Sequence, residues 1–253
     1  MPVHWLFEIV KWRLLINRCH RISLKTATIA VISGLTMAIF TPNRIGEIVS
    51  RVFVLPKEKR DQGVALSGVN TLALLIVTQV FGILGIAIFV SSTSSIDNQI
   101  FIHKDWIIVL AALISLFLIA SYFNLSWIQK LVKLSGLEKK FPGINHAFSI
   151  LTVSDKLKAL GWSAAKYITY TLQFSFLLKF MGIDHSILFL LAGIMAIYLI
   201  LTYLPVITIG EAGVKGSITL LLLAHGPESE IAIIIASFII WILNLALPAI
   251  VGG

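Results

Sequence analysis

Four apolar stretches of the chain are each about as long as the ~20 helical residues that cross a lipid bilayer. They cover residues 67–90, 106–123, 159–181 and 231–251. None of these stretches alternates between polar and apolar residues, as a half-buried β-strand would. The sequence therefore predicts an all-α protein, a polytopic helical membrane protein.

The composition excludes the common classes of soluble protein. Of the 253 residues, 58% are hydrophobic and 13% are charged, whereas soluble domains are about 45–50% apolar and about 25% charged. The net charge of +8 comes from short basic runs between apolar segments, and such runs orient membrane proteins. A soluble enzyme, a nucleic-acid-binding domain and a disordered chain are excluded. We expect residues 1–253 to form a single integral membrane domain with no nucleic-acid partner.

The distribution of Lys and Arg predicts which connections face the cytoplasm. Residues 1–25 and 44–60 carry five of these bases each, and residues 124–158 carry six. The connections with at most one such base are 91–105, 182–185 and 225–230. Because basic loops stay on the cytoplasmic side, we expect the first three connections to be cytoplasmic and the others to be outside. This topology places the C-terminus in the cytoplasm and the protein in a bacterial cytoplasmic (inner) membrane.

Two further apolar stretches, 24–40 and 186–204, run directly into polar sequence that contains Pro and Gly. The first has basic connections on both flanks, whereas the connections around the second region carry no Lys or Arg. We therefore expect 24–55 and 186–224 each to enter the membrane, turn inside it and leave on the same side. Two re-entrant hairpins from opposite faces form an inverted pseudo-repeat, as in many transporters. The alternative in each region is two ordinary short spans joined by a tight turn.

The expected breaks in these hairpins have a chemical cause. Proline has no amide hydrogen to donate and glycine tolerates unusual dihedral angles, so both residues interrupt helices. An Ile-Gly-Glu sequence occurs at both breaks, at 45–47 and 209–211, which favours a repeat. Irregular backbone at membrane depth is tolerated inside protein or beside a water-filled cavity. The residues expected to break the helices are Pro42, Gly46, Pro205, Gly210 and Gly213.

The connection 124–158 is the longest polar part of the chain. Lys130 and Lys133 lie among apolar residues that recur at helical spacing. These apolar residues are Trp127, Ile128, Leu131, Val132 and Leu134. The pattern predicts a basic amphipathic helix that lies on the anionic inner leaflet.

Ionisable residues follow the first break. Arg44, Glu47 and Arg51 are spaced by three and four residues, which places them on one face of a helix. Ionisable side chains at membrane depth are costly and are therefore candidates for function. Since the planar guanidinium group matches a phosphate with two parallel hydrogen bonds, we expect Arg44 and Arg51 to bind a lipid phosphate. Glu47 either orients an arginine or pairs with an amine; alternatively, its ion pair with arginine only locks the hairpin.

A second ionisable residue, Glu211, lies in the second break, four residues before Lys215. We expect Glu211 to contact a cationic group of the substrate or to carry a proton that couples transport to a gradient. The alternative is an ion pair with Lys215 inside the hairpin.

A polar stripe runs along the stretch 159–181. Lys166, Tyr170 and Gln173 follow Trp162 at spacings of four, four and three residues. Such a stripe is costly against lipid, so we expect it to face an internal cavity and to contribute to substrate binding. Lys166 is either a third phosphate contact or a side chain that extends to the membrane interface.

The sequence offers no metal or cofactor site. The six histidines are scattered, and the single cysteine, Cys19, cannot form an intramolecular disulfide. No P-loop, dinucleotide fingerprint, nucleophile elbow or zinc helix motif is present. We therefore expect no cofactor, and a transporter rather than an enzyme.

Several motifs carry a resemblance to a known family. They are Lys11–Ile16, Ser33–Leu35, Thr41–Glu47 with Arg51, and Gly210–Gly213. Together they resemble the lysylphosphatidylglycerol synthetase transmembrane, or flippase-like, family, over roughly residues 5–250. The resemblance implies a lipid-translocating membrane protein, since characterised relatives move aminoacylated phosphatidylglycerol from the inner to the outer leaflet. Those relatives also carry a cytosolic synthetase domain and further N-terminal spans, which we expect this stand-alone member to lack.

The sequence thus predicts a flippase-like transporter that moves a phospholipid or another lipid phosphate between leaflets. Its expected partners are membrane lipids with an anionic or phosphate head group, and a second copy of the chain or an envelope-synthesis enzyme. One alternative is a membrane module that transports nothing and anchors or regulates an enzyme of envelope lipid or glycan synthesis. Another is an intramembrane transferase that acts on a lipid-linked substrate.

Overall fold

The computed structural model describes residues 3–41, 45–92, 104–136, 141–204, 210–224 and 226–252, without the side chains of 104–108. The regular elements within these ranges are helices, which confirms the all-α prediction. The helices of the first half are α1 (His4–Ile16), α2 (Leu24–Ile39), α3 (Ile45–Arg51), α4 (Arg60–Ser92) and α5 (Lys104–Phe123). The second half contains α6 (Ser126–Leu134), α8 (Gly143–Ser149), α9 (Val153–Phe180), α10 (Ile187–Tyr203), α11 (Glu211–Leu223), α12 (Pro227–Trp241) and α13 (Leu247–Gly252).

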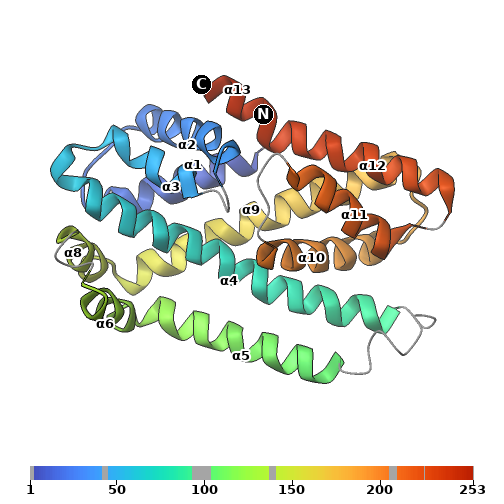
Figure 1. Cartoon of the computed structure of the whole chain (residues 1–253), viewed down its shortest axis with the longest axis horizontal. Coiled ribbons are helices and arrows are strands. Elements are labelled where there is room, and N and C mark those ends of the chain that lie inside the picture. The colour runs from blue at the N-terminus through green and yellow to red at the C-terminus, as the bar shows by residue number, and fades with distance from the viewer. Residues whose placement is uncertain are drawn as a thin grey trace.

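Two pairs of consecutive helices extend toward the middle of the molecule from opposite ends (Figure 1). α2 starts at the end where α4 also starts, and α3 returns to that end; α10 and α11 do the same from the end where α12 starts. Within the first pair, a Cβ atom on Gly46 would lie 2.5 Å from the carbonyl oxygen of Met37. Within the second pair, a Cβ atom on Gly193 would lie 2.8 Å from the side chain of Leu223. Each pair is therefore a closely packed helical hairpin.

The helix interruptions fall beside some of the predicted break residues rather than at all of them. Gly46 lies inside α3, where the absence of a side chain serves the contact with α2 and not a turn. Gly210 directly precedes α11, but Gly213 lies inside that helix. Pro42 and Pro205 lie outside the described residues. The two breaks therefore come earlier in the chain than Gly46 and Gly213.

Some of the helices are long and apolar enough to cross a membrane. By length and composition these are Lys57–Ser92 and Pro227–Gly252. A third candidate consists of Val109–Phe123 and Ser126–Leu134, two helices bent by 88° at the break between them. α2 and α10 are apolar but shorter. α9, the predicted span 159–181, is not in this group, and polar residues recur along its length.

The two ends of the molecule differ in charge. The turn after α1, the start of α4, and α6 and α8 lie at one end of the molecule (Figure 1). The end of α4 and the starts of α10 and α12 lie at the opposite end. The connections rich in Lys and Arg thus share one end of the molecule, which is the distribution that the positive-inside rule requires of a membrane protein.

Two apolar cores are joined by α4. The first core lies around α1, α2 and the beginning of α4, and the second around α9, α10, α11 and α12. α4 packs along α10 with very little space between the two backbones. A Cβ atom on Gly82 would lie 2.5 Å from Leu199, and one on Gly85 would lie 2.4 Å from Met195. Small residues at such positions allow helices to approach closely within a membrane.

Candidate functional site

A carboxylate on α1 lies at the centre of a buried charge cluster. The Oε1 atom of Glu8 accepts hydrogen bonds from Arg51 Nη1 and Asn70 Nδ2, both at 2.8 Å. Its Oε2 atom accepts one from Lys166 Nζ at 2.8 Å and lies 3.1 Å from Lys11 Nζ. Glu8 is 2% exposed, so one buried carboxylate joins α1 to α3, α4 and α9.

The cations around Glu8 have further partners. Arg51 also forms an ion pair with Glu47, one turn earlier on α3. Lys11 Nζ donates to Ser163 Oγ at 3.0 Å and to the carbonyl oxygen of Asn70 at 3.2 Å. Because buried charges are stable only when they are paired and hydrogen-bonded, these contacts explain how so many ionisable groups are accommodated. We call Glu8, Lys11, Glu47, Arg51 and Lys166 the charge cluster.

Local sequence places these side chains. Glu8 and Lys11 are three residues apart on α1 and therefore share a face. Glu47 and Arg51 are four residues apart on α3. The side chain of Arg51 runs across Gly34 of α2, where a Cβ atom would lie 3.0 Å from Arg51 Cγ. A glycine at this position thus gives the arginine room to reach α1.

The charge cluster carries a net positive charge. Its three cations, Lys11, Arg51 and Lys166, exceed its two carboxylates by one. Two buried donors beside it, Arg51 Nε and Trp5 Nε1, have no hydrogen-bond acceptor among the described residues. An anion with several oxygen atoms would satisfy both the charge and the donors, whereas a cation would add to the excess.

Aromatic side chains connect the charge cluster to the second hairpin. Lys166 Nζ lies 5.2 Å from the centre of the Trp5 ring, and Lys215 Nζ lies 5.5 Å from that of Tyr198. The Tyr170 and Tyr198 rings meet edge-on with their centres 4.8 Å apart. Cations over aromatic faces are stabilised by the ring quadrupole. The two hairpins therefore contribute to one continuous polar and aromatic region.

The chain is similar to one family of known proteins. Residues 2–252 match the family model described as the lysylphosphatidylglycerol synthase TM region. The chain belongs to this family. No curated protein and no solved structure matches the chain significantly. This family member is therefore an integral membrane protein linked to lipid biology.

The structure of this family member brings several of the predicted site residues together. Glu47, Arg51 and Lys166 all belong to the charge cluster, with Lys166 turned inward to Glu8. Tyr170 lies in the aromatic region that leads to the second hairpin. The predicted contact Arg44 lies outside the described residues.

Two predicted residues of the family member lie away from the charge cluster. Glu211 pairs with Lys215 at 3.5 Å, the alternative that the spacing offered. Gln173 is half-buried on α9 and forms no hydrogen bond with another described residue. Within the described ranges, no three His, Cys, Asp or Glu side chains are grouped so that they could hold a metal ion.

The centre of the site was not predicted from the sequence. Glu8 and Lys11 did not figure among the predicted site residues, and neither did Asn70 or Ser163, which hydrogen-bond to them. A usable signal was present, because an acidic and a basic residue one turn apart in the apolar stretch Trp5–Ile16 are as costly as those in the breaks. The hydrogen-bonding partners on α4 and α9 carry no comparable signal.

Proposed function

We propose that this protein is a flippase-like transporter that moves a lipid with a phosphate head group between the two leaflets. The observation that carries the proposal is the buried, net-positive charge cluster, through which Glu8 of α1 contacts α3 of the first hairpin and α9. The two hairpins extend from opposite ends of the molecule (Figure 1). Buried ionisable residues in a membrane protein mark substrate pathways. The family membership supports a role in lipid biology.

The proposed membrane arrangement has α2–α3 and α10–α11 as re-entrant hairpins related as an inverted pseudo-repeat. Each hairpin contains a helix that is too short to cross a bilayer, since an α-helix rises 1.5 Å per residue and a span needs ~20 residues. These short helices are α3 with 7 residues and α11 with 13 residues. Their approach from opposite ends (Figure 1) supports this arrangement. Transporters of this type bind substrate near the bilayer midplane, where the broken helices meet.

The chemistry proposed for the site follows from its charge. A phosphodiester carries one negative charge, which equals the excess positive charge of the cluster. Lys166 and Arg51 are its proposed ligands, together with Arg44. Binding would exchange part of the pairing of Lys166 and Arg51 with Glu8 for pairing with the phosphate, so the cations of the charge cluster keep a counter-charge. The acyl chains stay in the surrounding lipid, and Glu211 and Lys215 contact the head group near the second hairpin.

The proposal is tested by reconstituting the protein in vesicles that contain fluorescent phosphatidylglycerol. A membrane-impermeant reductant then removes the label from the outer leaflet alone. With wild type, the protected fraction should fall below the half expected for empty vesicles. Arg44→Ala, Glu47→Gln and Lys166→Gln should each slow scrambling at least about tenfold, because a hydrogen bond to a charged group contributes about 1.5–3 kcal/mol.

The matched control is Lys130→Gln, which removes one positive charge from the exposed side of α6. It should scramble lipid at the wild-type rate, and all variants should elute as single species in size-exclusion chromatography. Unchanged scrambling in all three site variants would remove these residues from the mechanism. A wild type that does not scramble any head group, but co-purifies with an envelope-synthesis enzyme, would favour the anchoring role instead.

A further inference from the structure

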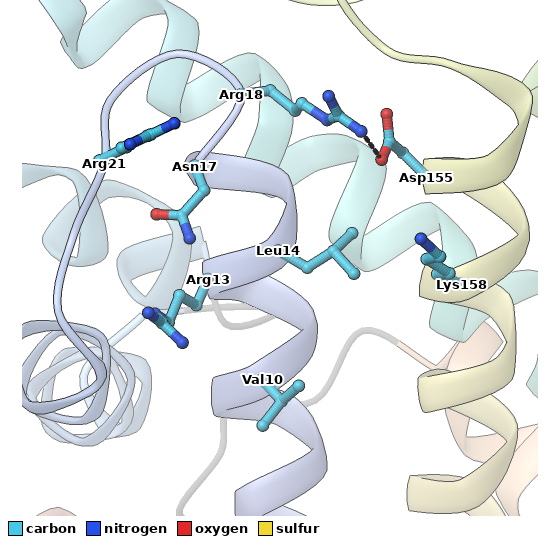
Figure 2. A pocket seen from close by; sticks show the side chains of 8 residues that line it. All are labelled: Val10, Arg13, Leu14, Asn17, Arg18, Arg21, Asp155 and Lys158. Atoms are coloured by element: carbon cyan, nitrogen blue, oxygen red, sulfur yellow. Dashed lines mark hydrogen bonds and ion pairs between the residues drawn. The ribbon is translucent and has the colours of Figure 1, made fainter.

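A second basic site lies at the end of α1, away from the charge cluster. It is a cleft of about 460 Å³ between the last turns of α1, the turn that follows, and the first turns of α9 (Figure 2). Its lining residues are Val10, Arg13, Leu14, Asn17, Arg18, Arg21, Asp155 and Lys158. We call it the basic cleft.

The basic cleft and the charge cluster use different faces of the same helix. Glu8 and Lys11 point into the buried cluster, and Leu15 continues their side of α1 into the core. The cleft residues Val10 and Arg13 lie about half a turn away on the helix. A ligand in the cleft therefore does not contact Glu8, and the two sites can be altered separately.

The basic cleft has a surplus of positive charge that its own carboxylate does not balance. Its four bases, Arg13, Arg18, Arg21 and Lys158, face one acid, Asp155. Arg18 pairs with Asp155 at 2.6 Å (Figure 2). Lys158 and Arg21 are exposed, and neither forms an ion pair with another described residue.

Arg13 is the third base available to a ligand. Its Nε atom donates to the carbonyl oxygen of Ile22 at 3.1 Å, which fixes the side chain beside the turn. The rest of its guanidinium group forms no hydrogen bond with another described residue and keeps its donors. Arginine and lysine donors around one cleft are the chemistry that recognises phosphate.

The inner wall of the basic cleft is apolar. Val10 and Leu14 line it, and one turn further along this side of α1 Leu6 is 60% exposed. The face of α1 thus changes from apolar to basic toward the end of the helix where the Lys- and Arg-rich connections lie. A free phosphate would contact only the basic part of this face. A phospholipid would contact both parts, with its phosphate on the basic residues and its acyl chains on the apolar ones.

We propose that the basic cleft binds the phosphate of an anionic phospholipid in the leaflet next to it, with the acyl chains along Leu6 and Val10. This site is separate from the charge cluster and does not depend on transport. Basic residues near an anionic surface each strengthen binding about fivefold, and the Arg18–Asp155 pair holds the turn and α9 together around the ligand.

The test is native mass spectrometry of the full chain in neutral detergent, titrated with phosphatidylglycerol. Arg21→Gln/Lys158→Gln should weaken the first binding step about 30-fold, the product of two such contributions. The control is Lys25→Gln/Lys57→Gln, which removes the same charge from exposed positions outside the cleft. It should bind phosphatidylglycerol as the wild type does, and phosphatidylcholine should compete with phosphatidylglycerol poorly.

Three results would overturn the proposal. They are equal binding by the cleft variant and the wild type, an equal loss in the control variant, and full competition by soluble glycerol phosphate, which would make the cleft a site for free phosphates. The vesicle assay distinguishes this failure from that of the transport proposal. Lys166→Gln should slow scrambling at least about tenfold and leave tight lipid binding in the cleft unchanged.

Discussion

Glu8 shows how much of the candidate site depends on a single side chain. It is the carboxylate that contacts Lys11, Arg51 and Lys166 together. The cations come from three helices and would repel one another without it. The contribution of Glu8 to stability can therefore be measured by replacing this one residue.

Replacing Glu8 with Gln should lower the free energy of unfolding by about 3–5 kcal/mol, because it leaves buried cations without their counter-charge. The measurement is chemical unfolding in detergent, followed by tryptophan fluorescence. Glu58→Gln is the control, since Glu58 is exposed, and its effect should stay within about 0.5 kcal/mol. Equal stability of the wild type and Glu8→Gln would show that the cluster does not hold these helices together.

Asp155 gives the protein a defined response to acid. It lies in the first turn of α9, before the predicted span 159–181. Burial alone would raise the pKa of Asp155, but hydrogen bonds from Arg18 and Thr152 outweigh that effect and hold the pKa below its ordinary value. A carboxylate with a lowered pKa in the folded state stabilises the fold above its unfolded pKa of about 3.9, and this contribution is lost as the pH falls.

The melting temperature of Asp155→Asn should therefore lie below that of the wild type at pH 7. The difference should begin to shrink as the pH falls below about 4, where Asp155 of the unfolded wild type takes up a proton, and should vanish only below the lower pKa that Asp155 has in the folded state. Melting curves of both proteins between pH 3 and pH 7 in one detergent measure it. A difference that stays constant over this range would mean that the charge of Asp155 does not contribute.

Residue spacing could predict only the local part of the site. The four-residue interval between Glu47 and Arg51 predicted their shared face, and the structure pairs them. The contact between Glu8 and Lys166 joins positions 158 residues apart in the chain. No spacing rule reaches across that distance, because it depends on how α1 and α9 pack. The partner of Lys166 could therefore be identified only from the three-dimensional structure.

At the scale of helices, the position of each element was easier to predict than its neighbours. The stretches 24–40 and 186–204 form α2 and α10, since apolar length and the polar sequence after it fix where such helices run. The predicted amphipathic helix forms α6, whose Leu131 and Leu134 are exposed. The packing of α4 on α10 depends on how their side chains fit together. The sequence carries only a weak sign of it, the small residues Gly82 and Gly85.

The seam between α4 and α10 should be sensitive to one added methyl group. Gly85→Ala places a Cβ atom 2.4 Å from Met195 and 2.7 Å from the carbonyl oxygen of Ala192. We expect a loss of about 1–3 kcal/mol in unfolding free energy, the cost of overpacking a filled interface. Gly68→Ala on the same helix is the control, because among the described residues nothing beyond the adjoining backbone of α4 lies within 4 Å of its added Cβ.

Gly68→Ala should be neutral or stabilise the protein by up to about 1 kcal/mol, since Ala favours a helix over Gly. Thermal unfolding of both variants in the same detergent supplies the comparison. If the two substitutions had the same effect, the close approach of α4 and α10 would not contribute to stability.

At the scale of the whole molecule, the charge at the two ends predicts how the protein is oriented. Lys133 lies on α6 at the basic end, and Glu228 lies in the first turn of α12 at the other end. We expect the basic end to face the cytoplasm, which also places the C-terminus there. Orientation describes how the protein sits in the bilayer, so the packing of the helices against one another does not determine it.

In intact cells, a membrane-impermeant maleimide should label Glu228→Cys and leave Lys133→Cys unlabelled until the membrane is permeabilised. Both variants are made after replacing Cys19, the single native cysteine. The chain without cysteine is the control and should take up no label. Labelling of Lys133→Cys from outside would reverse the proposed orientation. The basic cleft would then lie next to the outer leaflet instead of the inner one.

The contrast between the α4–α10 seam and the charge cluster limits how this molecule can change shape. The seam is a contact between backbones without slack, whereas α3 and α9 meet α1 through ion pairs. A competing anion can take the place of a carboxylate in a buried ion pair without leaving the cation uncompensated, but a backbone seam opens only as a whole. In the proposed transporter, a change that opens the interior would therefore keep α4 and α10 together and would shift α3 and α9 relative to α1.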